Sequence, residues 1–326
     1  MASGFRPAWP NSVTSDNKLT SFCAVMTTAS RHAGQDRAAP TTADKARRTG
    51  ESTGLCAGET RAMTQAVQST TVNPNALSEP ARGALVDELY AAHTEIFGGV
   101  SKAEFAKYVV DSPADRTRIQ VYRDAGRVVG YFAVHTFVEQ IDGQRWVVVR
   151  AEAGKLPAYR RNVSGTLMIS EVLRACVRYP RARKAYLGCF VHPSAYVAMG
   201  HVAPQMYPHW ERPTPTDTQR AMDRLADNFG LSQVEEADRG LRKVGWITRE
   251  TDQDRDSWAR RQDAMSEFFM ARNPGYRRGD GLVVLVPLSA TAFVEGTLRH
   301  LRRALGRRVA RLTRTARAPA RLTAET

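Results

Sequence analysis

The sequence predicts a mixed α/β domain, in which an antiparallel N-terminal meander of strands is followed by a strand–helix–strand unit and flanked by helices. Alternating apolar runs separated by the turns "RDAG" and "IDGQ" indicate the meander, because short turns of this kind join antiparallel strands. A strand, an amphipathic helix and a further strand then follow between residues 145 and 191, and such a unit normally makes two parallel neighbours by a right-handed crossover. Apolar residues make up 42% of the 326 residues, enough for a buried core.

Two helices are expected to open the ordered part, near Leu77. Ser78 is a typical N-cap for the first, and Ser101 with Glu104 has the spacing of a capping box for the second. The apolar face of the first helix repeats every three to four residues, at Leu85, Leu89, His93 and Ile96.

The remaining elements follow from their apolar patterns and turn residues. Pro180 closes the helix of the strand–helix–strand unit, and Gly230 closes a helix that begins at Thr216 or Asp217. A Trp- and Phe-rich helix is expected from Trp258 to Phe269. The strands are expected at 118–122, 127–138, 145–154, 184–191, 242–248 and 282–288.

The segment "LPAYRRNVSGTLMISEVLRAC" places a polar turn directly before a helix. A helix N-terminus presents unpaired backbone N–H groups and a partial positive charge, which together favour an anion. Arg160 and Arg161 add donors suited to phosphate, and Gly165 allows a close approach of the backbone. The turn therefore predicts binding of a pyrophosphate-like group without a metal.

The order of elements and this turn resemble the GCN5-related N-acetyltransferase (GNAT) family. The acyl-CoA motif of that family reads Gln/Arg-x-x-Gly-x-Gly/Ala, preceded by a proline and an aromatic residue. Pro157, Tyr159, Arg160, Val163 and Gly165 fall on those positions, and Val163 stands where the first glycine is usual. Valine still offers its N–H group but narrows the loop.

The resemblance implies a GNAT-like mixed sheet with a splayed central strand pair. The strand that ends near Leu156 would separate from the strand that begins at Lys184, and acetyl-CoA or another acyl-CoA would lie between them. An amine acceptor, not identified by the sequence, would attack the thioester directly in a ternary complex. The residues implied in cofactor binding are Leu156, Arg160, Arg161, Asn162, Val163, Ser164, Gly165 and Thr166.

Proton transfer needs a base and an acid. Glu152 or Glu139 could serve as the base through water, with an exposed, solubilising glutamate as the alternative. His192 follows the strand that faces the expected cleft, and a neighbour of a helix N-cap is its alternative. The tyrosine that often acts as the acid is replaced by Met199, so Tyr196 one turn earlier is the candidate, with a packed core tyrosine as the alternative.

The ends of the chain differ from its centre. Residues 1–75 are poor in large apolar side chains and predict a disordered extension before a domain over 76–297. The net charge of +14 is concentrated at the C-terminus, where residues 296–326 hold nine Arg and one Glu. Residues 298–326 predict a basic amphipathic helix and tail.

This tail leaves three interpretations open. Residues 298–321 have the composition of a helix that contacts an anionic membrane, and a nucleic-acid arm is less favoured because no aromatic residue interleaves its arginines. A last helix packed on the domain is the third. The alternative to an N-acyltransferase is a catalytically degenerate GNAT-shaped protein that uses this tail to bind membrane or nucleic acid.

The sequence predicts neither a metal site nor a membrane span. Cys189, His192, His201 and His209 match no common zinc spacing, and the four cysteines form no CxxC pair. No apolar run approaches the roughly 20 residues that a spanning helix needs, and no secretory signal is visible. We therefore expect a cytoplasmic protein, with peripheral membrane contact through the tail as a further possibility.

Overall fold

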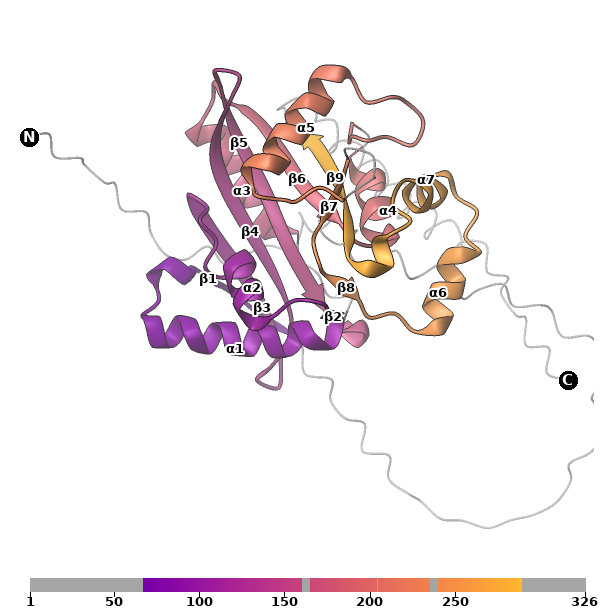
Figure 1. Cartoon of the computed structure of the whole chain (residues 1–326). Coiled ribbons are helices and arrows are strands. Elements are labelled where there is room, and N and C mark those ends of the chain that lie inside the picture. The colour runs from indigo at the N-terminus through magenta and orange to yellow at the C-terminus, as the bar shows by residue number, and fades with distance from the viewer. Residues whose placement is uncertain (1–66, 160–164, 204, 235–239, 289–326) are drawn as a thin grey trace, which may run out of the picture.

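The computed structural model describes residues 67–159, 165–203, 205–234 and 240–288. Within them a seven-stranded sheet runs in the order β1-β3-β4-β5-β6-β9-β7 (Figure 1). Each pair of neighbours is antiparallel except β5 and β6, which are parallel. The predicted fold class, a mixed sheet with an antiparallel N-terminal meander flanked by helices, is confirmed. The strands are β1 (Gln68–Val72), β3 (Arg116–Asp124), β4 (Arg127–Ile141), β5 (Gln144–Lys155), β6 (Arg183–Phe190), β7 (Leu241–Lys243) and β9 (Asp280–Pro287).

The described ranges contain seven α-helices. They are α1 (Glu79–Ile96), α2 (Lys102–Val109), α3 (Thr166–Arg178), α4 (Pro193–Val202), α5 (Thr216–Asn228), α6 (Asp252–Ala259) and α7 (Ala264–Arg272). Short 3₁₀ turns lie at η2 (Pro74–Ala76), η3 (Pro157–Tyr159) and η4 (Tyr276–Arg278), and β2 (Phe97–Gly98) pairs with β8 (Ile247–Thr248). Of the helices described, none is long and apolar enough to cross a membrane.

The meander is set by its two turns. Ala125-Gly126 joins β3 to β4, and Asp142-Gly143 joins β4 to β5; all four residues have positive φ. Two-residue turns of this kind match the twist of antiparallel strands. The turn at Asp142-Gly143 fixes the register of β4 on β5, from Ile141 opposite Gln144 to Gly130 opposite Lys155.

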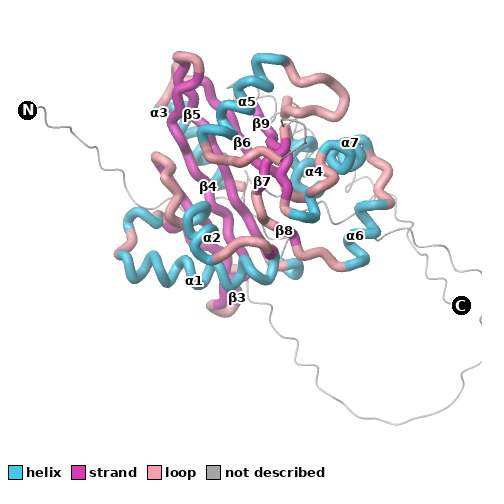
Figure 2. Tube along the Cα trace, in the orientation of Figure 1, coloured by secondary structure: helices cyan, strands magenta, loops and turns pink. Residues whose placement is uncertain are grey.

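Helices lie on both sides of the sheet (Figure 2), and strand β4 contributes side chains to an apolar cluster on each side. Tyr131 and Ala133 pack in the cluster that contains residues of α1 and α2. Phe132 and Val134 belong to the cluster that contains residues of α3 and α4. This alternation follows from the two-residue period of a strand, and it buries both faces of the sheet.

Three expectations need correction. The segment predicted as disordered, 1–75, includes β1, which pairs with β3 from Gln68 opposite Arg123 to Val72 opposite Ile119. Backbone hydrogen bonds hold this polar edge strand, so an apolar pattern could not reveal it. The helix predicted over 258–269 is two helices, because Asp263 caps α7. The strand predicted over 242–248 is β7 and β8, separated at Gly245, where φ is 80°. Residues 1–66 and the basic tail 298–326 lie outside the described residues.

Candidate active site

The parallel pair β5 and β6 separates along its length. The two strands are paired only from Trp146 opposite Arg183 to Val149 opposite Tyr186. Beyond that point β5 stays on β4 as far as Lys155, whereas β6 stays on β9 as far as Phe190. The two strands are therefore held apart by their outer neighbours, and an opening forms between them, as the GNAT resemblance implies.

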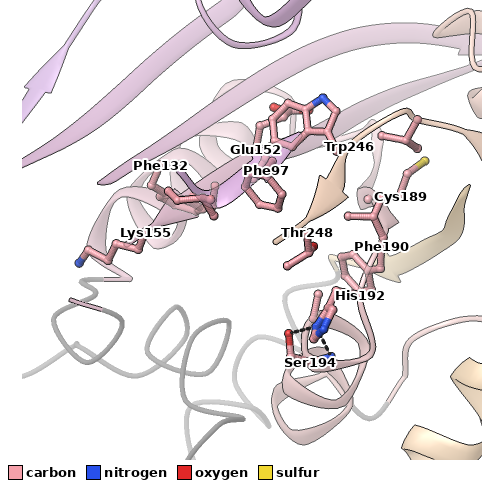
Figure 3. A pocket seen from close by; sticks show the side chains of 18 of the residues that line it. Phe97, Phe132, Glu152, Lys155, Cys189, Phe190, His192, Ser194, Trp246 and Thr248 are labelled. Atoms are coloured by element: carbon pink, nitrogen blue, oxygen red, sulfur yellow. Dashed lines mark hydrogen bonds between the residues drawn. The ribbon is translucent and has the colours of Figure 1, made fainter. Parts of the chain in front are cut away.

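A cavity of about 250 Å³ occupies this opening. Its walls come from the unpaired halves of β5 and β6, from the start of α4 and from β8 (Figure 3), and α6 adds Asp254 and Trp258. Nine aromatic residues give it a largely apolar lining, and they are Phe97, Tyr108, Tyr122, Tyr131, Phe132, Tyr186, Phe190, Trp246 and Trp258.

Glu152 lies in the β5 wall. Its side chain is 14% exposed, its Oε2 lies 2.9 Å from His135 Nε2, and its Oε1 lies 3.6 Å from Arg150 Nη2. Burial raises the pKa of Glu152, but the neighbouring His135 and Arg150 outweigh burial and hold this pKa below its ordinary value. Glu152 is thus an ionised cavity-lining carboxylate and not an exposed, solubilising one. Glu139 lies near the other end of β4, where it accepts a hydrogen bond from Asn228.

His192 lies in the opposite wall and is also the N-cap of α4. Its Nδ1 accepts a hydrogen bond from the Ser194 backbone N–H at 3.2 Å and lies 2.6 Å from Ser194 Oγ. Its Nε2 lies 2.8 Å from Glu250 Oε1. The structure therefore combines both interpretations of His192, the helix cap and the cavity-lining residue. Neither Ser194 nor Glu250 was among the site residues predicted from the sequence.

Tyr196 is not among the residues that line the cavity. It is fully buried, its hydroxyl donates to the Pro208 carbonyl at 2.9 Å, and its ring stacks on Phe268 at 5.6 Å. Burial raises its pKa well above the ordinary value for tyrosine. This is the environment of the packed core residue that sequence analysis kept as the alternative, and Met199 is buried in the same cluster. Tyr196 has no access to a substrate in this geometry.

Of the residues predicted to hold the cofactor, Arg160, Arg161, Asn162, Val163 and Ser164 lie outside the described residues. The structure describes the other three, Leu156, Gly165 and Thr166. Leu156 is buried beyond the end of β5 and donates its N–H to the Val129 carbonyl at 3.0 Å. Gly165 precedes α3, which begins at Thr166, and no N-cap side chain accepts a hydrogen bond from the first N–H groups of this helix.

Two further cavity residues were not predicted as part of the site. Lys155 ends β5, and its Nζ lies 3.6 Å from the centre of the Tyr122 ring. Burial lowers the pKa of Lys155 to about 8. Cys189 lies on β6, and burial raises the pKa of its thiol to about 11, so the thiol is protonated at neutral pH. Within the ranges described, no three His, Cys, Asp or Glu side chains gather as metal ligands.

No family model and no curated protein matches the chain. The solved structures that match include NAA60 of Arabidopsis thaliana in complex with acetyl-CoA, with 12% identity, a TM-score of 0.31, and coverage of 68% of this chain and 98% of that chain. An acetyltransferase of the GNAT family from Streptococcus pneumoniae matches with 12% identity, a TM-score of 0.28, and coverage of 68% of this chain and 99% of that chain.

A third match is the GNAT-like decarboxylase GphF in complex with isobutyryl-CoA, with 14% identity, a TM-score of 0.30, and coverage of 68% of this chain and all of that chain. At these TM-scores the likenesses carry no weight for the activity of this chain. The fold assignment rests on the strand pairing itself.

Proposed function

We propose that this protein is an acyl-CoA-dependent N-acyltransferase, with acetyl-CoA as the donor and an amine as the acceptor. The observation that carries the proposal is the separation of β5 and β6 beyond Val149 and Tyr186, with a cavity between them. Past that point the facing edges of the two strands make no ladder hydrogen bonds to each other. An extended pantetheine arm has amide groups that can pair with such strand edges, because backbone N–H and C=O groups are strong hydrogen-bonding groups.

The start of α3 supports the same proposal. The helix begins beyond β5 at Thr166, and its N-terminal N–H groups and dipole favour a pyrophosphate. The predicted contacts from Arg160 to Ser164 belong to this part of the proposal. A donor bound in this way would direct its thioester toward the walls that carry Glu152 and His192.

The proposed reaction is a direct transfer. The amine nitrogen attacks the thioester carbonyl carbon, a C–N bond forms, the C–S bond breaks, and the sulfur leaves as a thiolate. An acceptor bound as an ammonium first loses one proton to a base and becomes a neutral amine. In the transfer itself one further proton leaves the nitrogen and one reaches the sulfur, so the site needs groups that accept and return a proton. Glu152 on β5 and His192 at the start of α4 are the titratable residues proposed for these steps, and Tyr196 is not included.

The cavity lining indicates how an acceptor would be held. Glu152, Glu250 and Asp254 place three carboxylates among the aromatic rings of the lining. Carboxylates favour a cationic ammonium group, and aromatic faces favour both apolar substituents and cations. We therefore expect a primary amine that carries an apolar or aromatic group.

The test is a transfer assay with the full chain, acetyl-CoA and a panel of aliphatic, arylalkyl and peptide amines. Release of the CoA thiol and the mass of each product are measured together. N-acetylation of at least one amine, with loss of activity on Glu152→Gln or His192→Gln, supports the proposal. Failure of the folded chain to bind acetyl-CoA would overturn it.

A further inference from the structure

We propose that Ser194, hydrogen-bonded to His192 and through it to Glu250, is the catalytic residue that carries the proton from the acceptor amine to the leaving sulfur. This inference rests on the proposed N-acyltransfer and names the groups that move the proton from nitrogen to sulfur, which leaves Glu152 as the base that deprotonates the bound ammonium. All three residues line the same cavity. They come from two segments, because Glu250 lies 58 residues after His192 in the sequence.

The hydrogen bonds fix the direction of proton donation. A backbone N–H can only donate, so the contact of Ser194 N–H with His192 Nδ1 at 3.2 Å leaves that nitrogen without a proton. Ser194 Oγ, 2.6 Å from the same nitrogen, must then donate its hydrogen to it. The remaining ring proton is on Nε2, which donates to Glu250 Oε1 at 2.8 Å. The chain of donation runs from Ser194 through His192 to Glu250.

The surroundings hold this arrangement in place. The side chains of His192 and Glu250 are only 13% and 8% exposed. The imidazole meets Trp258 edge to face at 5.5 Å and Tyr276 at 6.0 Å. Glu250 directly precedes the N-cap of α6, Thr251, which forms a capping box. A carboxylate held in this way orients the ring and stabilises the imidazolium that forms when it accepts a proton.

A helix cap alone does not account for the cluster. Capping of α4 explains why the Ser194 N–H meets Nδ1, but it explains neither the hydroxyl on the same nitrogen nor the carboxylate on the far side of the ring. Figure 3 shows His192 and Ser194 joined by their hydrogen bonds, on another part of the cavity wall than Glu152. The acid expected on α4, Tyr196, donates to Pro208 instead, so Ser194 is the hydroxyl of this helix that reaches the cavity.

The proton steps balance. As the amine attacks, its N–H proton passes to Ser194 Oγ while the Ser194 hydroxyl proton passes to His192 Nδ1. Protonated Nδ1 gives up the hydrogen bond that it accepts from the Ser194 backbone N–H, and Glu250 stabilises the resulting imidazolium. When the C–S bond breaks, His192 returns its proton to Ser194 Oγ, and the hydroxyl proton of Ser194 passes to the sulfur. The net result is one proton moved from nitrogen to sulfur, with all three residues restored.

The test compares steady-state kinetics of the full chain with acetyl-CoA and an amine identified in the panel above. Ser194→Ala is expected to lower kcat by about 100-fold, the ordinary contribution of one positioned proton-transfer group, with the KM for acetyl-CoA and Tm unchanged. Ser194→Thr keeps the hydroxyl and is expected to retain most of kcat. Ser232→Ala, an exposed serine outside the cavity, is the matched control and should leave kcat unchanged.

Glu250 is a positioning residue, and Glu250→Gln separates its charge from its structural role. Glutamine still accepts from Nε2 but carries no charge, so kcat is expected to fall about tenfold while KM and Tm remain unchanged. An unchanged kcat in this variant would show that Glu250 only orients the ring, and would overturn the relay.

The outcomes distinguish this proposal from the function on which it rests. If the unchanged protein transfers the acetyl group and Ser194→Ala has a kcat within twofold of the kcat of the unchanged protein, the relay is overturned but the N-acyltransferase is kept. An acetyl group found on Ser194 by mass spectrometry after incubation with acetyl-CoA alone would also overturn it, because the serine would then be a nucleophile. Absence of transfer by the unchanged protein would overturn both.

Discussion

The buried histidine of α1 predicts a stability that depends on pH. His93 is 1% exposed, and it lies among the rings of Phe97, Phe105 and Trp246. Its Nδ1 is 2.8 Å from the Tyr131 hydroxyl, whereas its Nε2 has no hydrogen-bond partner among the described residues. Burial lowers the pKa of His93 from 6.5 to about 4, so the folded protein keeps the imidazole neutral.

The sign and the size of the effect follow by linkage. Between these two pKa values the unfolded chain binds a proton that the folded chain does not, so stability is lost as pH falls from about 6.5 toward 4. From pH 7.5 to pH 4.5 the loss due to His93 amounts to about 2.5 kcal/mol.

Urea unfolding at those two pH values measures this loss, and the variant His93→Leu removes the titrating group. The variant is itself less stable, because the buried Tyr131 hydroxyl loses its partner, but this cost is present at both pH values and cancels. We expect the free energy of unfolding to fall by about 2.5 kcal/mol more in the unchanged protein than in the variant. Equal falls, within about 0.5 kcal/mol, would show that burial does not depress the pKa of His93.

Two further predictions concern an ion pair and a thiol. Arg116 donates to both carboxylate oxygens of Glu171, at 2.7 and 3.2 Å, and Glu171 is buried. Because Glu171→Ala would leave the Arg116 charge without this partner, it should lower the free energy of unfolding by about 2–3 kcal/mol. Asp217 pairs with Arg220 in an exposed position, so Asp217→Ala should lower the free energy of unfolding by less than about 0.5 kcal/mol. Equal losses in Glu171→Ala and Asp217→Ala would show that the buried pair of Arg116 and Glu171 contributes no more than an exposed one. The pKa of Cys189 is raised to about 11, so little of its thiol is ionised at pH 8. We therefore expect Cys189 to react with iodoacetamide at pH 8 about 100-fold more slowly than an ordinary thiol, as measured by peptide mass mapping. Rapid labelling would contradict the burial of this thiol.

The sequence predicted those parts of the fold that local chemistry determines. The turn at Asp142-Gly143 places β4 beside β5, and the capping box of Ser101 and Glu104 begins α2 as predicted. Strand β1 escaped prediction because polar residues such as Ser69 and Thr71 carry no apolar alternation, and its pairing with β3 is a property of the sheet edge.

The candidate site was predictable only in part, for a similar reason. His192 and Glu152 could be placed on facing walls because each belongs to a strand or its end. Glu250 could not, because its contact with His192 depends on how α6 packs, which no local pattern encodes. The burial of Tyr196 likewise depends on α7, whose Phe268 and Phe269 cover its ring.

The most direct test of the central claim is calorimetric titration of the full chain with acetyl-CoA, repeated on Ala153→Trp and Val177→Trp. Ala153 lies in the unpaired half of β5, where it lines the cavity with an exposed side chain, so tryptophan there would fill the opening without entering the core. Val177, 84% exposed on α3 and outside the cavity, is the matched control. We predict one bound acetyl-CoA per chain, lost in Ala153→Trp and kept in Val177→Trp. Equal affinity in both variants would contradict the placement of the donor between β5 and β6.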